Sequence, residues 1–387
     1  MENYPIINKK MMMQNAETKA VWKAAKKYYA RRKRHGQPLK GALLKVVQTP
    51  SADNKVLDMT GSLKSESKMI TQTATNAVTE TKLTNAVKSA GIHGMSGNGF
   101  PVYQKLEAFA KSASSSADSV LLVNAVECDP GLIHDEWLVK AHFEEIERGI
   151  DIISQAFHIS RSILVTKAVK RMKSTTSESE HHLEICHIPA RYPAGEEHFL
   201  IQAVLGISLP KSELPVNHGI LVMNVQTVWQ IVRILNGTFD GGHYITVADI
   251  KKGIAKPAYV NESTSVSELL QTAFGARDNR EYKCYAGGGI MTSHEVTDAE
   301  ICTDKISFAA YLPSAFEAQL SNRNKCKGCG ACSRKCPAGI DVRKIVSLKE
   351  QDPNADISMY HPEACLHCGS CTWYCHGNKT PEKYMNS

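Results

Sequence analysis

The sequence has no long hydrophobic run. Although 42% of its 387 residues are hydrophobic, aliphatic stretches such as Gly219–Met223 are short. They fall far below the roughly 18 residues that a membrane-spanning helix needs. The first residues, Met1–Tyr4, are not a basic segment followed by an apolar one, so no secretory signal is expected. The sequence predicts a cytoplasmic protein of two or three domains without a membrane span of its own.

Acidic residues are scarce near the amino end. Residues 1–50 contain 12 Lys and Arg but two acids, Glu2 and Glu17, whereas the remainder contains 34 Lys and Arg and 37 acids. We interpret residues 1–80 as a basic arm followed by a linker, because residues 50–80 are rich in Ser, Thr and Lys. The arm is expected to dock on an acidic surface of a partner protein or of the same chain, and no nucleic acid is expected as a partner.

Cysteine is scarce everywhere except near the carboxyl end. Of the 12 cysteines, Cys128, Cys186, Cys284 and Cys302 are scattered, and the other eight lie between residues 326 and 375. Because nothing indicates secretion, this clustering favours metal or cluster binding over a disulfide framework.

The eight clustered cysteines form two copies of one motif. Residues 326–337 read C-x₂-C-x₂-C-x₃-C-P, and residues 365–375 repeat C-x₂-C-x₂-C-x₃-C. This is the pattern of bacterial two-cluster ferredoxins, in which the fourth cysteine of each run ligates the other cluster. Zinc is disfavoured because its four ligands usually come as two separated pairs. Cluster one is therefore assigned Cys326, Cys329, Cys332 and Cys375, and cluster two is assigned Cys365, Cys368, Cys371 and Cys336.

The middle of the chain has the periodicity of an α/β domain. Helices are expected near 81–90, 102–112 and 135–157, and strands at 119–126, 162–166 and 219–225, the last followed by a helix that ends near Gly237. Strands that alternate with helices imply a mostly parallel sheet whose functional loops lie at the carboxyl ends of the strands.

Four segments of this domain carry candidate chemistry. Gly91–Pro101 contains four glycines, and backbone N–H groups exposed at a helix start bind phosphate, although a Gly-rich turn is more often plain structure. Polar groups in Asn124–Gly131 follow a buried strand, Tyr192–Glu197 opens another helix, and Asn224 ends a strand. For each carboxylate taken singly, a helix cap or a solvated turn is the plain alternative.

These segments, in this order and followed by a two-cluster ferredoxin, resemble the RnfC-like electron-transfer flavoproteins (the RnfC, PduS and PrdC type). The central domain is also similar to the NADH-binding FMN subunit of respiratory complex I. The resemblance covers roughly residues 81–378 and includes a β-grasp (SLBB) segment with Tyr244–Val247, a Lys-Pro turn at 256–257 and Val266–Leu270. It implies a Rossmann-like FMN/NADH-binding domain at 81–237, an SLBB domain at 238–312, and an α-helical ferredoxin-like domain with two [4Fe–4S] clusters at 313–387.

The resemblance also implies roles for single residues. Gly94, Gly97 and Gly99 shape the loop around the flavin, Phe100 stacks near the nicotinamide, and Lys105 neutralises phosphate. Asn124 and Glu127 hydrogen-bond the isoalloxazine edge, Gly195, Glu196 and Glu197 line the nucleotide side, and Asn224 holds the ribityl phosphate. Glu127 and Glu196 are the expected catalytic residues.

The function implied is that of an electron-transfer subunit. Electrons pass between NADH (through FMN) or ferredoxin and a partner reductase or membrane complex, by way of the two clusters, in the cytoplasm or at the inner face of the cell membrane. The family loop usually reads Gly-x-Gly-Gly-Ala-Gly-Phe-Pro-Thr, and here Ser96 and Asn98 replace small residues. This departure leaves open a flavin-less iron–sulfur relay or adaptor without NADH dehydrogenase activity. A nucleic-acid-binding iron–sulfur protein is a third interpretation, which the basic arm alone supports.

Overall fold

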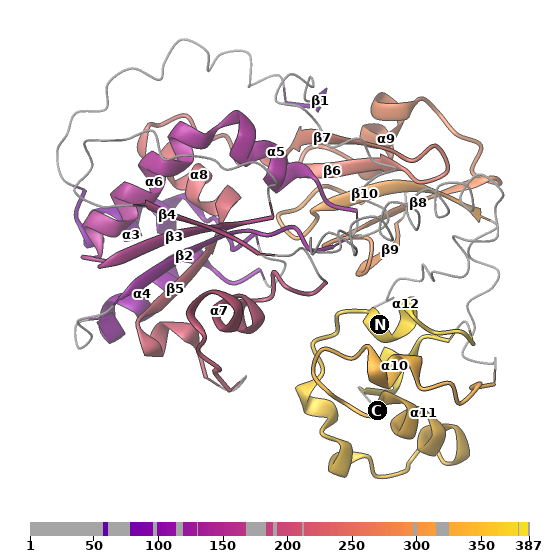
Figure 1. Ribbon diagram of the computed structural model, residues 1–387. Helices are drawn as coiled ribbons and strands as arrows, with labels where there is room; N and C mark the ends of the chain where they lie inside the picture. The colour runs from indigo at the N-terminus through magenta and orange to yellow at the C-terminus, as the bar shows by residue number, and fades with distance from the viewer. Residues whose placement is uncertain are drawn as a thin grey trace, which may run out of the picture.

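The chain folds into a parallel sheet with helices, a mixed sheet beside it, and a small helical region that ends the chain (Figure 1). The computed structural model describes residues 57–60, 78–95, 99–113, 119–129, 131–167, 183–188, 192–210, 213–296, 300–314, 325–377 and 379–385. The basic arm and three residues of the glycine loop, Ser96, Gly97 and Asn98, lie outside the described residues.

The first sheet has four parallel strands in the order β4-β3-β2-β5. Its strands are β2 (Val120–Ala125), β3 (Arg161–Thr166), β4 (Leu183–His187) and β5 (Ile220–Asn224). Alternate residues of a strand face opposite sides. Leu121 and Val123 accordingly belong to one apolar cluster, while Leu122 belongs to another. The expected parallel sheet is confirmed, and β4 is an additional edge strand that the sequence analysis did not predict.

Helices cover both faces of this sheet. They are α3 (Glu80–Ala90), α4 (Val102–Ala113), α5 (His134–Ala141), α6 (Phe143–Ala156), α7 (Glu197–Leu205) and α8 (Val225–Leu235). Apolar residues of α7 pack on the face that holds Leu122, and those of the other five pack on the opposite face. The single helix expected over 135–157 is wrong in one respect, because the chain breaks at His142, whose backbone is not helical (φ −129°, ψ 33°).

The second sheet has six strands in the order β1-β7-β6-β10-β8-β9 and is mixed. Its strands are β1 (Leu57–Asp58), β6 (His243–Asp249), β7 (Ile254–Val260), β8 (Tyr282–Gly287), β9 (Ser293–Glu295) and β10 (Phe308–Pro313). Helix α9 (Val266–Phe274) packs on one face through Leu269 and Leu270.

Two details of this sheet differ from the sequence analysis. Leu57 and Asp58, within the supposed linker, pair with Ala258 and Tyr259 of β7 and so extend the sheet. Pro257 lies inside β7 and pairs with Thr246, rather than forming a turn. A proline is tolerated there because the short β1 ladder does not need a donor from it.

The final region is built from short helices around the two cysteine runs. They are α10 (Ala331–Arg334), α11 (Val342–Gln351) and α12 (Ser370–Trp373), with 3₁₀ turns at Ser358–Tyr360, Pro362–Ala364 and Pro381–Met385. Its own core contains Ile340, Ile345, Val346 and Ile357.

This C-terminal region packs on the rest of the chain through α12. Trp373 is buried in one apolar cluster with Phe308 of β10, with Met291 from the loop between β8 and β9, and with Ile133 ahead of α5. The described helices include none that is both long and apolar enough to cross a membrane.

Candidate functional site

A pocket of about 200 Å³ lies beside the carboxyl end of β5 and the start of α8. Its walls are mainly apolar, with Val102, Val216, Ile220, Val222 and Met223 among them. Five residues expected at the flavin site line it: Gly94, Phe100, Lys105, Glu197 and Asn224. The structure thus brings together residues that come from four separate segments of the sequence.

Lys105 is the cation of this pocket. Its position on α4 places Nζ 2.5 Å from Oε1 of Glu197 at the start of α7, and 3.1 Å from the carbonyl oxygen of Val222 in β5. Two residues predicted to act on the phosphate side and on the nucleotide side therefore form one ion pair. An anionic ligand at Lys105 has to share this lysine with Glu197.

The start of α8 faces the same pocket. Asn224 caps the helix, because its Oδ1 accepts a hydrogen bond from the amide of Gln226 at 2.7 Å. Thr227, one turn further, accepts a hydrogen bond from the amide of Met95 at 3.4 Å and so ties the glycine loop to the helix. A helix start favours anions, because its first N–H groups and its dipole point toward the ligand.

Asn124 positions the backbone of the Tyr192–Glu197 loop. Its Nδ2 donates to the carbonyl oxygen of Gly195 at 2.8 Å, and its Oδ1 accepts from the amide of Val126 at 2.9 Å. A Cβ at Gly195 would lie 2.5 Å from the carbonyl oxygen of Val126, so only glycine fits there. Nearby, burial raises the pKa of the Cys128 thiol to about 12, which leaves it protonated.

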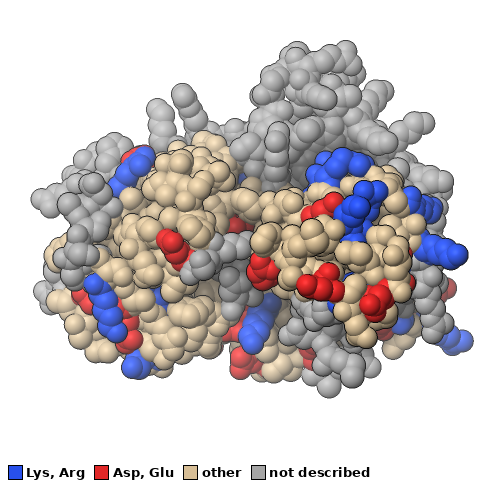
Figure 2. Space-filling model, turned by 90° about the horizontal axis from the view of Figure 1, so that it is seen from below, with Lys and Arg blue, Asp and Glu red and all other residues tan. Residues whose placement is uncertain are grey.

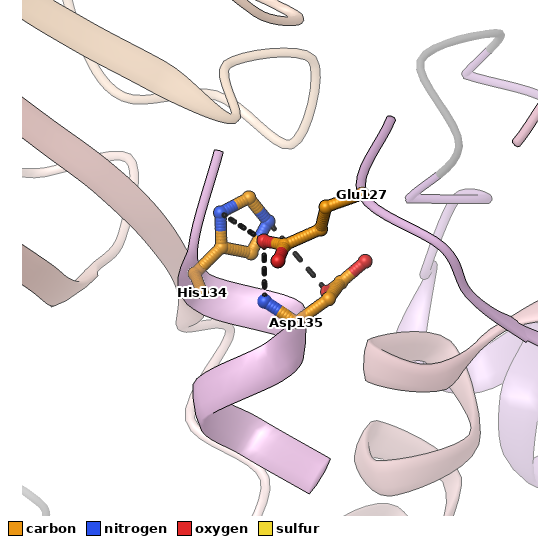
Figure 3. Close-up of side chains that lie close together, drawn as sticks. All are labelled: Glu127, His134 and Asp135. Atoms are coloured by element: carbon orange, nitrogen blue, oxygen red, sulfur yellow. Dashed lines mark hydrogen bonds and ion pairs between the residues drawn. The ribbon is translucent and has the colours of Figure 1, made fainter. Parts of the chain in front are cut away.

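Glu127 points into a buried charged cluster, away from the pocket (Figure 3). Its carboxylate accepts hydrogen bonds from the amides of Asp135 (2.7 Å) and Glu136 (3.0 Å), the first turn of α5, and lies 3.1 Å from Nζ of Lys167. Burial opposes ionisation, but Lys167, His134 and the two amides outweigh it and lower the pKa of Glu127. Glu127 is therefore a charged cap of α5 in this structure.

Asp135 links that cluster to the pocket. Its Oδ2 accepts a hydrogen bond from Nδ2 of Asn224 at 2.8 Å, while its Oδ1 has no hydrogen-bond partner. Burial, together with the charge of Glu127, raises the pKa of Asp135 to about 8. Burial also lowers the pKa of His134, whose Nδ1 lies 3.0 Å from the hydroxyl of Thr246. At neutral pH, Asp135 is thus mainly the acid form and His134 is neutral.

The remaining predicted residues have simpler surroundings. Glu196 caps α7 by accepting hydrogen bonds from the amides of His198 and Phe199, and it does not line the pocket. Phe100 is 45% exposed at the pocket, so its ring is available for stacking. Gly99 has φ +57° and lies beside the side chain of Lys305.

The cysteines fall into the two groups that were assigned. Cys336, Cys365, Cys368 and Cys371 line one small pocket, together with Gly369 and Glu382. Cys332 is near Cys375 and Cys326, since burial and then these two thiols raise its pKa. The amides of Gly328, His367 and Lys379 lie 3.3–3.4 Å from the sulfurs of Cys326, Cys365 and Cys375. Such N–H···S contacts stabilise thiolate ligands.

The residues that surround cluster two contact the rest of the chain. Tyr192 donates a hydrogen bond to the carbonyl oxygen of Cys368 at 2.6 Å. Gly369 lies so close to Met291 that a Cβ would be 2.4 Å from its carbonyl oxygen. The carboxylate of Asp129, in the Asn124–Gly131 loop, accepts from the amides of Ile290 (2.9 Å) and Met291 (3.0 Å). The loop of residues 290–291 is therefore held between the first domain and cluster two.

These surroundings fit the cofactors that the sequence implies. In the pocket, Lys105 and the start of α8 suit a phosphate, Gly94 leaves the floor free of a side chain, and the apolar walls suit a ring. In the C-terminal region, four thiols around one pocket suit a cubane cluster.

Some residues of the site were not singled out from the sequence. Tyr192 and Asp129 lie inside quoted motifs but had no assigned role, and Asp135, Lys167 and Thr227 were not candidates. The partners of Tyr192 and Asp129 lie 176 and 161 residues away in the chain, so no local pattern signals them.

Comparison with known families divides the chain as the geometry does. Residues 87–233 match the family described as the Nuo51 FMN-binding domain. Residues 319–383 match the 4Fe-4S dicluster domain. These matches assign FMN to the pocket domain and iron–sulfur clusters to the C-terminal region.

Similar curated proteins share one description, the RnfC component of an ion-translocating oxidoreductase complex. The protein from Vibrio cholerae serotype O1 (strain ATCC 39541 / Classical Ogawa 395 / O395) is 26% identical over 270 residues, which are 68% of this chain and 34% of the relative. That from Edwardsiella ictaluri (strain 93-146) is 27% identical over 74% of this chain and 36% of the relative. That from Buchnera aphidicola subsp. Acyrthosiphon pisum (strain APS) is 24% identical over 76% and 62%. The chain thus spans about a third of the length of the first two relatives.

Among solved structures, an NAD⁺-reducing [NiFe]-hydrogenase in the H₂-reduced state has the same fold over 80% of this chain and 61% of its own. The TM-score is 0.52 and the sequence identity is 17%. Fold, domain matches and relatives agree, and the chain is an RnfC-like protein with an FMN-binding domain and a 4Fe-4S dicluster domain.

Proposed function

We propose that this chain is an electron-transfer subunit that passes electrons between a reduced pyridine nucleotide and a partner reductase or membrane complex. FMN, when bound, supplies the conversion of a two-electron hydride into single electrons, which iron–sulfur clusters carry. Ferredoxin is the alternative donor or acceptor. The protein acts in the cytoplasm or at the inner face of the cell membrane, as a peripheral member of the complex.

The observation that carries this proposal is the contact between the two cofactor regions. The Tyr192–Glu197 loop supplies Glu197 to the pocket and, through Tyr192, a hydrogen bond to Cys368 in the second cysteine run. A single short loop therefore touches both the FMN domain's pocket and the residues assigned to cluster two. This is the arrangement that electron transfer between the two sites requires.

Each residue has a defined task in this proposal. Lys105 and the start of α8 hold the phosphate, and Asn124 fixes the Gly195 backbone against which the nucleotide lies. Glu127 orders α5 as its cap, so that Asp135 keeps its hydrogen bond with Asn224 at the pocket. Glu127 and Glu196 act on the substrate only if they leave the contacts they make here, and they remain the predicted catalytic residues.

An anaerobic visible spectrum before and after addition of NADH tests the proposal. Flavin bands at about 370 and 450 nm above a broad iron–sulfur absorption, bleached by NADH, are the expected result. An iron–sulfur absorption that dithionite bleaches but NADH does not change would contradict the nucleotide-dependent function.

A second candidate is a relay without flavin, and two observations favour it. Lys105 already has a carboxylate and a carbonyl partner, and the pocket of about 200 Å³ is below the roughly 300–1,000 Å³ usual for ligand sites. In that case the purified protein contains iron and sulfide but no extractable flavin.

A further inference from the structure

The C-terminal region uses its two cysteine runs differently, although their sequences repeat. The run at 365–371 is turned toward the body of the chain, where Tyr192, Met291 and the cluster around Trp373 cover it. The run at 326–332 makes no such contact among the described residues, and Cys329 is exposed, unlike the other seven cysteines of the motif. Electrons that enter through the covered half have to leave through the open half.

The open half is strongly basic. Residues 325–344 contain six Lys and Arg and one acid, Asp341. Lys325 and Lys327 flank Gly377 beside the sulfur of Cys375, Arg334 donates to the carbonyl oxygen of Cys329 at 2.8 Å, and Arg343 lies beside Gly330. These four cations, which we call the basic rim, therefore border the residues assigned to cluster one.

The basic rim has no acid of its own to neutralise it. Within the part of the chain that the structure describes, none of its four side chains has an ion-pair partner. The acids of this region lie in a different segment, at Glu350, Asp352, Asp356 and Glu363. Figure 2, which views the molecule from the side of this region, shows Lys and Arg gathered along one edge of its surface and acidic side chains elsewhere.

We propose that the basic rim around Cys329 is the docking surface for an acidic iron–sulfur protein of the ferredoxin kind, which exchanges electrons with cluster one. This inference rests on the proposed function and adds to it the place and chemistry of the partner. In the exchange, one electron leaves the reduced partner and one electron reduces this chain, and no bond or proton changes.

Charge and exposure together favour this partner over a nucleic acid or an anionic membrane. A phosphate polymer or a lipid surface needs the cations but does not need an exposed cysteine of the cluster between them. An electron partner needs both, because opposite charge steers the encounter and exposure shortens the distance.

The test uses the holoprotein under anaerobic conditions and a small acidic two-[4Fe–4S] ferredoxin as the probe. In the charge-reversed variant K325E/K327E, we expect the affinity for oxidised ferredoxin at low salt, measured by calorimetry, to fall at least about tenfold. The bimolecular rate of reduction by reduced ferredoxin should fall similarly, and the difference should vanish at high ionic strength. The matched control K82E/K111E, on exposed lysines of α3 and α4, should change neither quantity more than about twofold.

A second variant protects the test against loss of a cluster. R343E/K344E changes exposed residues of α11 outside the cysteine run and should show the same loss of affinity with unchanged iron content. Equal affinities in all variants, or equal losses in rim and control variants, would overturn the proposal. So would wild-type protein that binds vesicles of anionic phospholipid but not ferredoxin.

No pyridine nucleotide is added in this experiment, so its outcome is separate from that of the NADH test. A chain that exchanges electrons with ferredoxin but is not reduced by NADH would remove the nucleotide from the proposed function and leave the docking surface standing.

Discussion

The phenolic hydroxyl of Tyr192 donates a hydrogen bond to the carbonyl oxygen of Cys368 at a distance of 2.6 Å. Tyr192 begins the loop that supplies Glu197 to the pocket, and Cys368 is in the middle of the second cysteine run. This bond joins two motifs that the sequence presents as unrelated. It makes the position of the C-terminal region a property that single substitutions can change.

Removal of that hydroxyl tests the docking directly. In Tyr192→Phe, we expect faster hydrogen–deuterium exchange over residues 365–374, because a net contribution of about 1 kcal/mol is lost and the Cys368 carbonyl loses its donor. The control Tyr103→Phe removes a hydroxyl that contacts the neighbouring Gln104 on α4. Unchanged exchange in Tyr192→Phe would mean that the apolar contacts of Trp373 alone hold the region.

Gly369 tests the same interface by crowding it. In Gly369→Ala, a methyl group would lie 2.4 Å from the Met291 carbonyl oxygen, in addition to the strain of a left-handed backbone at φ +69°. Gly339→Ala is the matched control, because φ is +71° and nothing lies within 4 Å. The control should lose about 1–2 kcal/mol from backbone strain, and Gly369→Ala should lose clearly more, measured as the fall in Tm. Equal losses would show that Met291 yields without cost.

Lys105 tests the phosphate end of the pocket. In Lys105→Met, the charge that faces the pocket is removed, and affinity for FMN should fall about 10–100-fold, since a charge-assisted hydrogen bond contributes about 1.5–3 kcal/mol. The measurement is quenching of FMN fluorescence by apoprotein. Lys111→Met, two turns along α4 and exposed, should bind FMN like the wild type. An unchanged dissociation constant in Lys105→Met would place the phosphate elsewhere.

Asp135 predicts a dependence of stability on pH. The folded protein keeps this proton up to about pH 8, whereas an unfolded aspartate releases it near about pH 3.9. Between these values the unfolded state binds fewer protons, so the group's contribution to the free energy of unfolding falls as pH rises. Glu127, Lys167, His134 and Asn224 are the polar groups that face it.

The variant Asp135→Asn cannot lose a proton and should lack that slope. Its Tm relative to wild type should rise between about pH 5 and pH 8, while Glu144→Gln, an exposed change on α6, should follow the wild type. A constant difference between Asp135→Asn and wild type across this range would contradict the raised pKa.

The crossed assignment of the cysteines predicts the iron content of double variants. Cys336→Ser with Cys365→Ser removes two ligands of cluster two and should leave about half of the iron, with the signal of one cluster in electron paramagnetic resonance. Cys336→Ser with Cys326→Ser removes one ligand from each cluster and should lower both signals. If the first pair abolished both signals while the second spared one, each run would form its own cluster.

Local patterns predicted the elements whose residues are buried throughout. The aliphatic run of β2 and the repeated cysteine spacing are of this kind. Strand β4 was missed because it lies at a sheet edge, and only Leu183 of its five residues is fully buried. Helices α5 and α6 merged in the analysis because no glycine or proline marks the break at His142.

The candidate site was predictable in composition but not in its contacts. The glycine loop and the acidic motifs were recognisable, yet the pairing of Lys105 with Glu197 spans 92 residues of sequence. Glu127 is a strong candidate by motif, and the structure engages it with α5 and Lys167. Which carboxylate faces a ligand and which caps a helix is decided by tertiary packing, so sequence spacing alone does not reveal it.

The repeat in the C-terminal region has a consequence for engineering. Because the run at 365–371 is covered by the body and the run at 326–332 is open, the two copies are free to change for different reasons. Substitutions in the covered copy are limited by Met291 and Tyr192, whereas charges around the open copy can be exchanged without touching the flavin end. A redesigned set of charges at residues 325–344 would therefore redirect the same electron source to a different recipient.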